Sequence, residues 1–153
     1  MKFDFAISGV FRGSRPKNIQ SLYLLWAKGV RTIVNLEEGW GNLNPFIYKN
    51  AKEDWLAMGG KYYECNRSNL FPAGNGELYG TYLLIEMAKT FGDVFVHCFK
   101  GVDRTGEMIA YLQVRAGDDP VYAWDDAQKY GMHKRYFWWK PKFLKNCEDI
   151  WHK

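Results

Sequence analysis

The chain has 153 residues, of which 47% are hydrophobic and 25% are charged, and this balance excludes an intrinsically disordered protein. The formal net charge of +4 favours an anionic ligand but is too small by itself to indicate a nucleic-acid-binding protein. The length suits one compact domain, so we predict a single domain over residues 1–153. No stretch reaches membrane-spanning length, and Asp4 with other early polar residues interrupts any secretory pattern.

Hydrophobic periodicity and glycine and proline breaks divide the chain into alternating strands and helices. The run Val94-Phe95-Val96 is typical of a buried strand, whereas Leu22 and Leu25 share one face of a helix that ends at Gly29. The alternation predicts an α/β fold with a central, mostly parallel sheet of about four to five strands flanked by helices. In chain order, the predicted elements are strand 5–11, helix 18–28, strand 31–36, helix 45–58, strand 61–66, helix 77–90, strand 93–97 and helices 104–116, 120–130 and 141–152.

The most informative segment is HCFKGVDRTG, residues 97–106, which connects strand 93–97 to helix 104–116. In such a loop, backbone N–H groups and the helix dipole converge on an anion. The same field favours the thiolate form of Cys98, and the planar guanidinium of Arg104 matches two oxygens of a phosphate. Parallel sheets bind ligands at the carboxyl ends of their strands, where this loop is expected to lie. A thiolate beneath a captured phosphate is a nucleophile for phosphoryl transfer.

This Cys-x5-Arg sequence followed by Thr-Gly resembles the signature loop of the cysteine-dependent protein-tyrosine and dual-specificity phosphatases. The segment VFRGSRP, residues 10–16, followed by a helix and the strand at 30–36, is similar to the compact atypical dual-specificity phosphatases of bacteria, phages, plants and fungi. The resemblance implies their fold and the hydrolysis of phosphoric monoesters through a cysteinyl-phosphate, without metal or cofactor. It implies phosphotyrosine in phosphoproteins, inositol phosphates or phosphoinositides as substrates.

The resemblance also assigns roles to the residues in and around the loop. Cys98 is the nucleophile, Arg104 binds two phosphoryl oxygens, and Thr105 donates to the thiolate and assists hydrolysis, which is compatible with a hydrogen bond at the helix start. His97 braces the loop through hydrogen bonds. Asn35 supports the loop from beneath, although an ordinary turn at the strand end explains Asn35 equally well. The residues expected to bind the phosphate are Phe99, Lys100, Gly101, Val102, Asp103 and Arg104, with Gly101 in a conformation that turns amides inward.

The general acid is where the sequence departs from the common pattern. In most relatives an aspartate on a mobile loop about thirty residues before the nucleophile protonates the leaving group. The matching segment, residues 66–73, contains no Asp or Glu, and Asn69 stands where the aspartate is expected. The acid is therefore Asp103, as proposed for a similar Asp-Arg pair in the myotubularin lipid phosphatases, or another carboxylate, or the leaving group needs little assistance. Capping of the following helix is the alternative role for Asp103. The other candidate carboxylates are Glu38, Glu64 and Glu77.

Basic residues near the loop predict a shallow, positively charged rim formed by Lys100, Arg12, Arg15 and Arg67. A second cation beside the loop suits a substrate with more than one phosphate, although Lys100 is equally well explained as an ordinary exposed lysine. The segment 133–140 mixes bases with aromatic rings. We interpret its rings as covering the core, in preference to a contact with a membrane or with single-stranded nucleic acid.

The three cysteines, Cys65, Cys98 and Cys147, together with the need for a thiolate, favour a reducing compartment such as the cytoplasm. Cys65 ends a strand that we expect beside the Cys98 strand, where it could trap an oxidised Cys98 as a disulfide, although a buried structural cysteine is favoured. Two other functions stay open. One is a phosphate-binding pseudophosphatase that acts as an interaction module, and the other is a rhodanese-like sulfurtransferase or an arsenate reductase. No nucleic-acid partner is expected.

Overall fold

The computed structural model describes residues 1–37, 47–68 and 70–150, so Glu38 and Asn69 lie outside the described residues. Five strands form one sheet in the order β1-β2-β5-β3-β4. β2, β5, β3 and β4 run parallel, and β1 pairs antiparallel with β2 at the edge. The predicted α/β fold with a mostly parallel sheet is therefore confirmed. The strands are β1 (Phe3–Ile7), β2 (Val10–Gly13), β3 (Val30–Asn35), β4 (Lys61–Glu64) and β5 (Asp93–His97).

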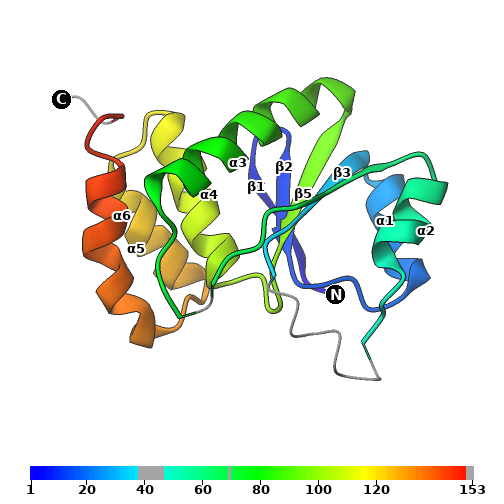
Figure 1. Cartoon of the computed structure of the whole chain (residues 1–153), viewed down its shortest axis with the longest axis horizontal. Helices are drawn as coiled ribbons and strands as arrows, with labels where there is room; N and C mark the ends of the chain where they lie inside the picture. The colour runs from blue at the N-terminus through cyan, green and yellow to red at the C-terminus, as the bar shows by residue number, and fades with distance from the viewer. Residues whose placement is uncertain (38–46, 69, 151–153) are drawn as a thin grey trace.

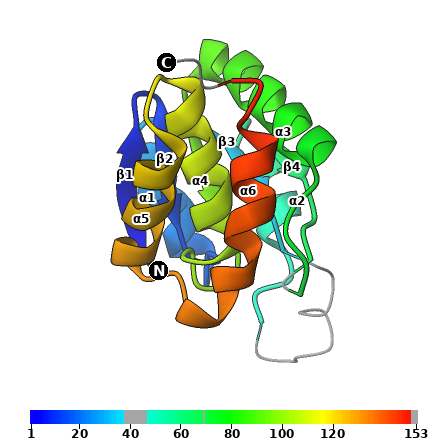
Figure 2. The same ribbon diagram turned by 90° about the vertical axis from the view of Figure 1, so that its left-hand side faces the viewer.

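Helices cover both faces of the sheet. α1 (Ile19–Ala27) and α2 (Ala51–Ala57) lie on one side, and the remaining helices lie on the other (Figure 1). Figure 2 shows α4, α5 and α6 in front of the sheet, with α3 beside them and α1 behind. The helices of the second side are α3 (Asn75–Ala88), α4 (Arg104–Arg115), α5 (Pro120–Tyr130) and α6 (Lys140–Asn146), with short 3₁₀ turns η2 (Lys89–Phe91) and η3 (Lys134–Trp139).

Three predicted elements differ from those observed. The single strand predicted over 5–11 is wrong: Gly9, with φ of 79°, provides a turn that folds this segment into the antiparallel pair β1 and β2. The helix predicted from residue 45 begins only at Ala51, in α2. The helix predicted over 141–152 is shorter, because α6 ends at Asn146, and the 3₁₀ turn η3 precedes it.

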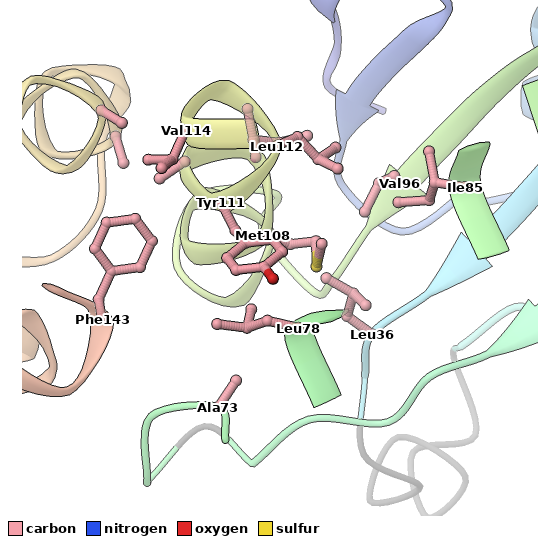
Figure 3. Packing of buried hydrophobic residues seen from close by; sticks show 14 of the residues in the cluster. Leu36, Ala73, Leu78, Ile85, Val96, Met108, Tyr111, Leu112, Val114 and Phe143 are labelled. Carbon is pink, nitrogen blue, oxygen red and sulfur yellow. The ribbon is translucent and has the colours of Figure 1, made fainter. Parts of the chain in front are cut away.

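The core lies on both faces of the sheet, because successive side chains of a strand point to opposite sides. On β5, Val94 and Val96 belong to the large cluster beneath α3 to α6, whereas Phe95 belongs to a smaller cluster beneath α1 and α2. Figure 3 shows how side chains of the large cluster from the sheet and the covering helices meet, among them Leu36, Met108 and Phe143. No helix among the described residues is long and apolar enough to span a bilayer.

Candidate active site

The segment singled out by the sequence lies at the carboxyl end of the central strand. Cys98 follows β5 directly and is 2% exposed, and α4 begins at Arg104. The last residue of β5, His97, is in register with Gly13 on β2 and Asn35 on β3. The loop at residues 98–103, which we call the phosphate loop, therefore sits where three parallel strands end, at the lower edge of the sheet in Figure 1.

The phosphate loop is held by the segment that follows β2. Gly101 has a φ of 78°, a left-handed conformation that glycine adopts readily in a tight loop. A Cβ atom at this position would lie 2.3 Å from the carbonyl oxygen of Gly13. The backbone N–H of Arg15 donates to the carbonyl of Phe99 at 3.2 Å. Only glycine at position 101 allows this close approach of two backbones. Gly101 therefore has the left-handed backbone conformation that glycine favours, and the inward orientation of the loop amides remains a prediction.

Arg12 does not lie on a basic rim, as we predicted, but is buried beneath the phosphate loop. Its guanidinium donates to the carbonyl oxygen of Gly101 at 3.0 Å and stacks on the Tyr130 ring, 3.7 Å from the ring centroid. Burial lowers the pKa of Arg12, whereas attraction to Tyr130 and to Cys98 opposes that change. Arg12 therefore places a buried positive charge beneath the loop that carries Cys98. Arg12 lies inside β2, between Phe11 and Gly13, whereas the predicted strand ended at residue 11, so its burial was not expected from the sequence.

His97 is buried at the end of β5 and lies against the phosphate loop. Its burial lowers the pKa of the imidazole to about 4, although Glu37 opposes this change, so the ring is neutral near pH 7. Nδ1 lies 3.2 Å from the Cys98 carbonyl oxygen, and in the tautomer with its proton on Nδ1 it donates to that oxygen. The bracing role of His97 remains a prediction, and this hydrogen bond is the contact that it requires.

Arg15 and Asn35 are occupied by partners next to the loop. Arg15 lies over the Phe99 ring and binds the buried carboxylate of Glu37 through two nitrogens, with Nε 2.9 Å from Oε2. The Asn35 amide donates to the Tyr62 hydroxyl at 3.1 Å, and its oxygen accepts from the Glu37 N–H at 2.8 Å. These Asn35 contacts stabilise the end of β3 and its turn, which matches the alternative interpretation of this residue.

Arg104 is the first residue of α4, and its Nη1 lies 3.4 Å from the carbonyl oxygen of Arg67. Arg67 itself is buried, so its predicted place on the rim is wrong. Its side chain donates to Thr81 at 2.5 Å and pairs with Glu77 at 3.2 Å, both on α3. Arg67 therefore anchors the segment after β4 and presents a backbone carbonyl to Arg104. The other nitrogens of the Arg104 fork have no hydrogen-bond partner among the described residues.

Thr105 and Asp103 flank Arg104 and differ in their surroundings. The Thr105 hydroxyl is fully buried and has no hydrogen-bond partner in the described part of the chain. The Asp103 side chain does not cap α4, so that alternative is wrong. Its Oδ1 accepts instead from the backbone N–H of His133 at 2.9 Å. Asp103 is thus held by the segment after α5, beside the first turn of α4.

Two of the other carboxylates considered as proton donors have partners. Glu77 pairs with Arg67 and accepts from the N–H of Gly74 at 3.0 Å, which ties it to the start of α3. Glu64 is half-exposed, lies 3.5 Å from Lys52, and lines a hollow of about 280 Å³ that also reaches His97. Glu38 lies outside the described residues, as does Asn69.

The sequence analysis missed Glu107, a buried carboxyl group on the first turn of α4. Both of its oxygens lie 3.2 Å from the backbone nitrogen of Ala73, and the side chain of Asn146 donates to the Ala73 carbonyl at 3.0 Å. Burial raises the pKa of Glu107 to about 7, although the Ala73 N–H and Arg67 oppose this change. The segment matched to the acid loop of relatives is therefore clamped at Ala73. A glutamate three residues after Arg104 and just before Met108-Ile109-Ala110 is the signal that could have found it.

Glu107 should make stability depend on pH. Its pKa in the folded protein, about 7, exceeds the ordinary value of 4.5, so the folded state keeps a proton that the unfolded state loses. The contribution of Glu107 to the free energy of unfolding is full below about pH 4.5 and is lost as pH rises toward 7. The difference of about 2.5 pH units corresponds to a loss of roughly 3 kcal/mol. Glu107→Gln should remove this dependence of stability on pH. The measurement is the free energy of unfolding of both proteins at about pH 5 and about pH 8.

His97 does not confuse this measurement. Because the pKa of His97 in the folded protein is near 4, the contribution of His97 to stability is lost as pH falls below 6.5, the ordinary pKa of histidine. This is the opposite direction from Glu107. His97 is present in both proteins, so its contribution cancels in the difference between wild type and Glu107→Gln. A difference that stays constant across this pH range would show that Glu107 titrates normally.

The aromatic segment before α6 is partly core. Tyr136 and Trp139 are buried, whereas Phe137 and Trp138 are exposed. The Trp138 ring meets Phe71 edge to face at 6.3 Å. The interpretation of these rings as core cover therefore holds for two of the four, and the other two lie on the surface beside the segment that follows Arg67.

Cys65 does not lie next to the strand that carries Cys98. It follows β4, and β3 lies between β4 and β5. Two strand spacings of about 4.8 Å separate the cysteine backbones by roughly 10 Å, beyond the reach of about 7 Å between Cα atoms in a disulfide. The predicted adjacency is wrong, and a disulfide between Cys65 and Cys98 would require the backbone to move.

No model of a known protein family matches this chain, and no curated protein sequence matches it. Several solved structures match it over nearly its whole length. Tk-PTP superposes with a TM-score of 0.76 at 17% identity, covering 97% of both chains. A DUF442 protein from Shewanella putrefaciens CN-32 gives a TM-score of 0.77 at 16% identity, covering 99% of this chain and 94% of the other chain. PTPMT1, solved with PI(5)P, gives 0.74 at 16% identity, covering 98% and 97% of the two chains.

This chain has the fold of the atypical cysteine-dependent phosphatases. The core catalytic domain of SIW14, a PP-IP phosphatase of S. cerevisiae solved with citrate, also matches, with a TM-score of 0.70 at 16% identity. This chain covers 99% of its own length and 86% of that domain. The expected dual-specificity-phosphatase-like architecture is therefore confirmed at the level of the fold.

Proposed function

We propose that this chain hydrolyses phosphoric monoesters through a cysteinyl-phosphate intermediate. The observation that carries the proposal is the position of Cys98, buried at the carboxyl end of the central strand, one loop before Arg104 at the start of α4. The fold shared with known phosphatases supports a phosphatase over a sulfurtransferase or an arsenate reductase. A reducing compartment such as the cytoplasm suits a thiolate nucleophile.

In the first step the Cys98 sulfur bonds to phosphorus while the bond to the leaving-group oxygen breaks, and that oxygen takes a proton from an acid. The Arg104 fork and the loop amides bind the phosphoryl oxygens as charge develops on them. Water then attacks phosphorus and gives a proton to the same carboxylate. The sulfur–phosphorus bond breaks, and the Thr105 hydroxyl, which is buried without a partner among the described residues, donates to the departing thiolate.

The substrates that we propose are a phosphotyrosyl protein or an inositol phosphate or phosphoinositide. The second group is supported by two structural neighbours, because one is a PP-IP phosphatase and another was solved with PI(5)P. A panel of such esters, assayed for released phosphate in the presence of EDTA, tests the proposal. Rapid acid quenching during turnover should trap wild-type protein carrying one phosphoryl group on Cys98. A phosphatase that turns over without this adduct would contradict the mechanism.

A phosphate-binding module without turnover is the second candidate. It is favoured by one observation, the absence of Asp and Glu from residues 66–73. Under this alternative the chain binds inorganic phosphate or a phosphoinositide, yet no ester in the panel releases phosphate. The assay therefore separates the two functions directly.

Asp103 is the acid that we propose, and Asp103→Asn tests it. Oδ1 is held by the His133 N–H, so the other oxygen is the one that carries the proton. An inositol ring ester leaves as a strongly basic alkoxide and needs that proton, whereas nitrophenolate hardly does. The variant should therefore lose about 10²-fold or more in kcat on the first ester and little on nitrophenyl phosphate.

The unfolding midpoint of the Asp103 variant is the control, because an amide oxygen accepts more weakly than a carboxylate from the His133 N–H, which can destabilise the segment after α5. If both esters slow equally, Asp103 positions Arg104 and does not transfer the proton. If neither slows, the proton comes from elsewhere, and Glu64 is the next residue to test.

A further inference from the structure

A second hollow, of about 570 Å³, lies beside the phosphate loop and shares residues with it. Phe99 and Lys100 of the loop form one wall, and the segment from Ser14 to Lys17, after β2, forms another. The N-terminus of the chain lies at the same edge of the sheet (Figure 1). The described residues that line it are Lys2, Ser14, Arg15, Pro16, Lys17, Ile47, Tyr48, Phe99 and Lys100.

Among the described residues, the lining of this hollow includes four cationic residues and no carboxylate, so its charge is positive. Arg15 is neutralised by Glu37, with which it forms a bidentate pair. Among the described side chains, no carboxylate lies within ion-pair distance of Lys2, Lys17 or Lys100. The Lys2 ammonium lies 4.3 Å from the centroid of the Tyr130 ring, and a multiply charged anion in the hollow is attracted by the positive charges of the lining residues.

The remaining lining supplies a hydroxyl group and apolar walls. The Ser14 oxygen accepts from the backbone N–H of Lys2 at 2.7 Å, which leaves its own proton available to donate. Phe99 is half exposed, and with Tyr48, Pro16 and Ile47 it offers surfaces for the carbon atoms of a ligand. The volume lies in the range of small-molecule sites, which is about 300–1,000 Å³. The hollow therefore suits a phosphorylated carbon skeleton rather than a simple ion.

We propose that this hollow binds a second phosphate group of the substrate while the first phosphate is bound by the phosphate loop. The inference rests on the proposed function and narrows its substrates to compounds that carry at least two phosphate groups. A phosphotyrosyl peptide with one phosphate leaves Lys2, Lys17 and Ser14 without a ligand. An inositol polyphosphate and a phosphoinositide share the required chemistry, so either one supplies the second phosphate.

The test compares two substrates in each variant. The measured quantity is the ratio of kcat/KM for inositol 1,4,5-trisphosphate to kcat/KM for nitrophenyl phosphate, which has one phosphate. Lys17→Gln should lower this ratio by about tenfold, and the double variant Lys2→Gln with Lys17→Gln should lower it further, because charged hydrogen bonds to the second phosphate are lost. A short-chain phosphatidylinositol bisphosphate, assayed in parallel, shows whether a lipid head group is accepted as well as the free polyphosphate.

Lys28→Gln is the matched control, since Lys28 is exposed at the opposite end of α1 and the substitution makes the same change in net charge. The ratio should stay at the wild-type value in this variant. An equal loss on both substrates in Lys17→Gln, or a loss of the same size in Lys28→Gln, overturns the proposal.

A binding measurement tests the hollow separately from the proposed phosphatase activity. Calorimetry with inositol hexakisphosphate on Cys98→Ser protein, with and without Lys17→Gln, needs no turnover. A weaker affinity in the Lys17 variant supports the hollow as an anion site even if no ester is hydrolysed. Equal affinities overturn it whether or not the chain is a phosphatase.

Discussion

Cys98→Ser is expected to abolish the hydrolysis of every ester while the protein still binds inorganic phosphate. A serine hydroxyl stays protonated near pH 7, so the attack on phosphorus loses its nucleophile, whereas the groups that hold the phosphate loop are unchanged. Loss of one oxyanion donor costs about 10²–10³-fold in rate, and loss of the nucleophile should cost at least about 10³-fold. The measurement is phosphate release at saturating substrate, together with calorimetric titration of inorganic phosphate.

Cys65→Ser is the matched control, because Cys65 is a half-buried cysteine at the end of β4, separated from the loop by β3. It should retain wild-type turnover. Residual activity above about one hundredth of wild type in Cys98→Ser would falsify covalent catalysis by this sulfur. Loss of phosphate binding together with a lower unfolding midpoint would instead show that the loop itself had collapsed.

Arg104→Lys should lose about 10²-fold or more in kcat/KM although the positive charge is retained. The guanidinium presents two parallel N–H groups to two phosphoryl oxygens, and one ammonium group cannot reproduce this geometry. Only Nη1 of Arg104 has a partner among the described residues, the Arg67 carbonyl, so the rest of the fork is available to a phosphate. In the proposed mechanism the fork follows the phosphoryl group into the transition state, so the loss should fall on kcat as well as on KM.

Arg31→Lys provides the comparison for that variant. Arg31 lies near the start of β3, at the opposite end of the sheet from the phosphate loop, where it stacks on Trp26. This substitution removes a guanidinium from the same protein and should leave kcat/KM within about twofold of wild type. A near-normal rate in Arg104→Lys would mean that the phosphate is clamped elsewhere.

The phosphate loop could be predicted from sequence because its determinants are local. The apolar run Val94-Phe95-Val96 specifies a strand buried on both faces, and the apolar pattern after Arg104 specifies a helix. Gly101 between them supplies the positive φ that the turn needs, and the spacing of Cys98 and Arg104 follows from the loop's length. The alternation of strands and helices likewise predicted the mostly parallel sheet before any contact was known.

The surroundings of that loop depend on the tertiary structure. Strand order places β3 between Cys65 and Cys98, and no local pattern encodes which strands are neighbours. The sequence predicts Arg12 and Arg67 as exposed cations, yet both are buried, because residues on other elements contact their guanidinium groups. These partners are Gly101 and Tyr130 for Arg12, and Thr81 for Arg67.

Two other hydrogen bonds near the loop also join residues far apart in the chain. The Ala73 N–H donates to Glu107, and the His133 N–H donates to Asp103. Burying a charged or polar group is favourable only when such partners are present, and the chain supplies them only once it has folded. The sequence by itself therefore determined the phosphate loop, whose geometry depends on neighbouring residues. The tertiary structure decided which charges support that loop and which remain free to bind a ligand, because both depend on contacts between distant segments.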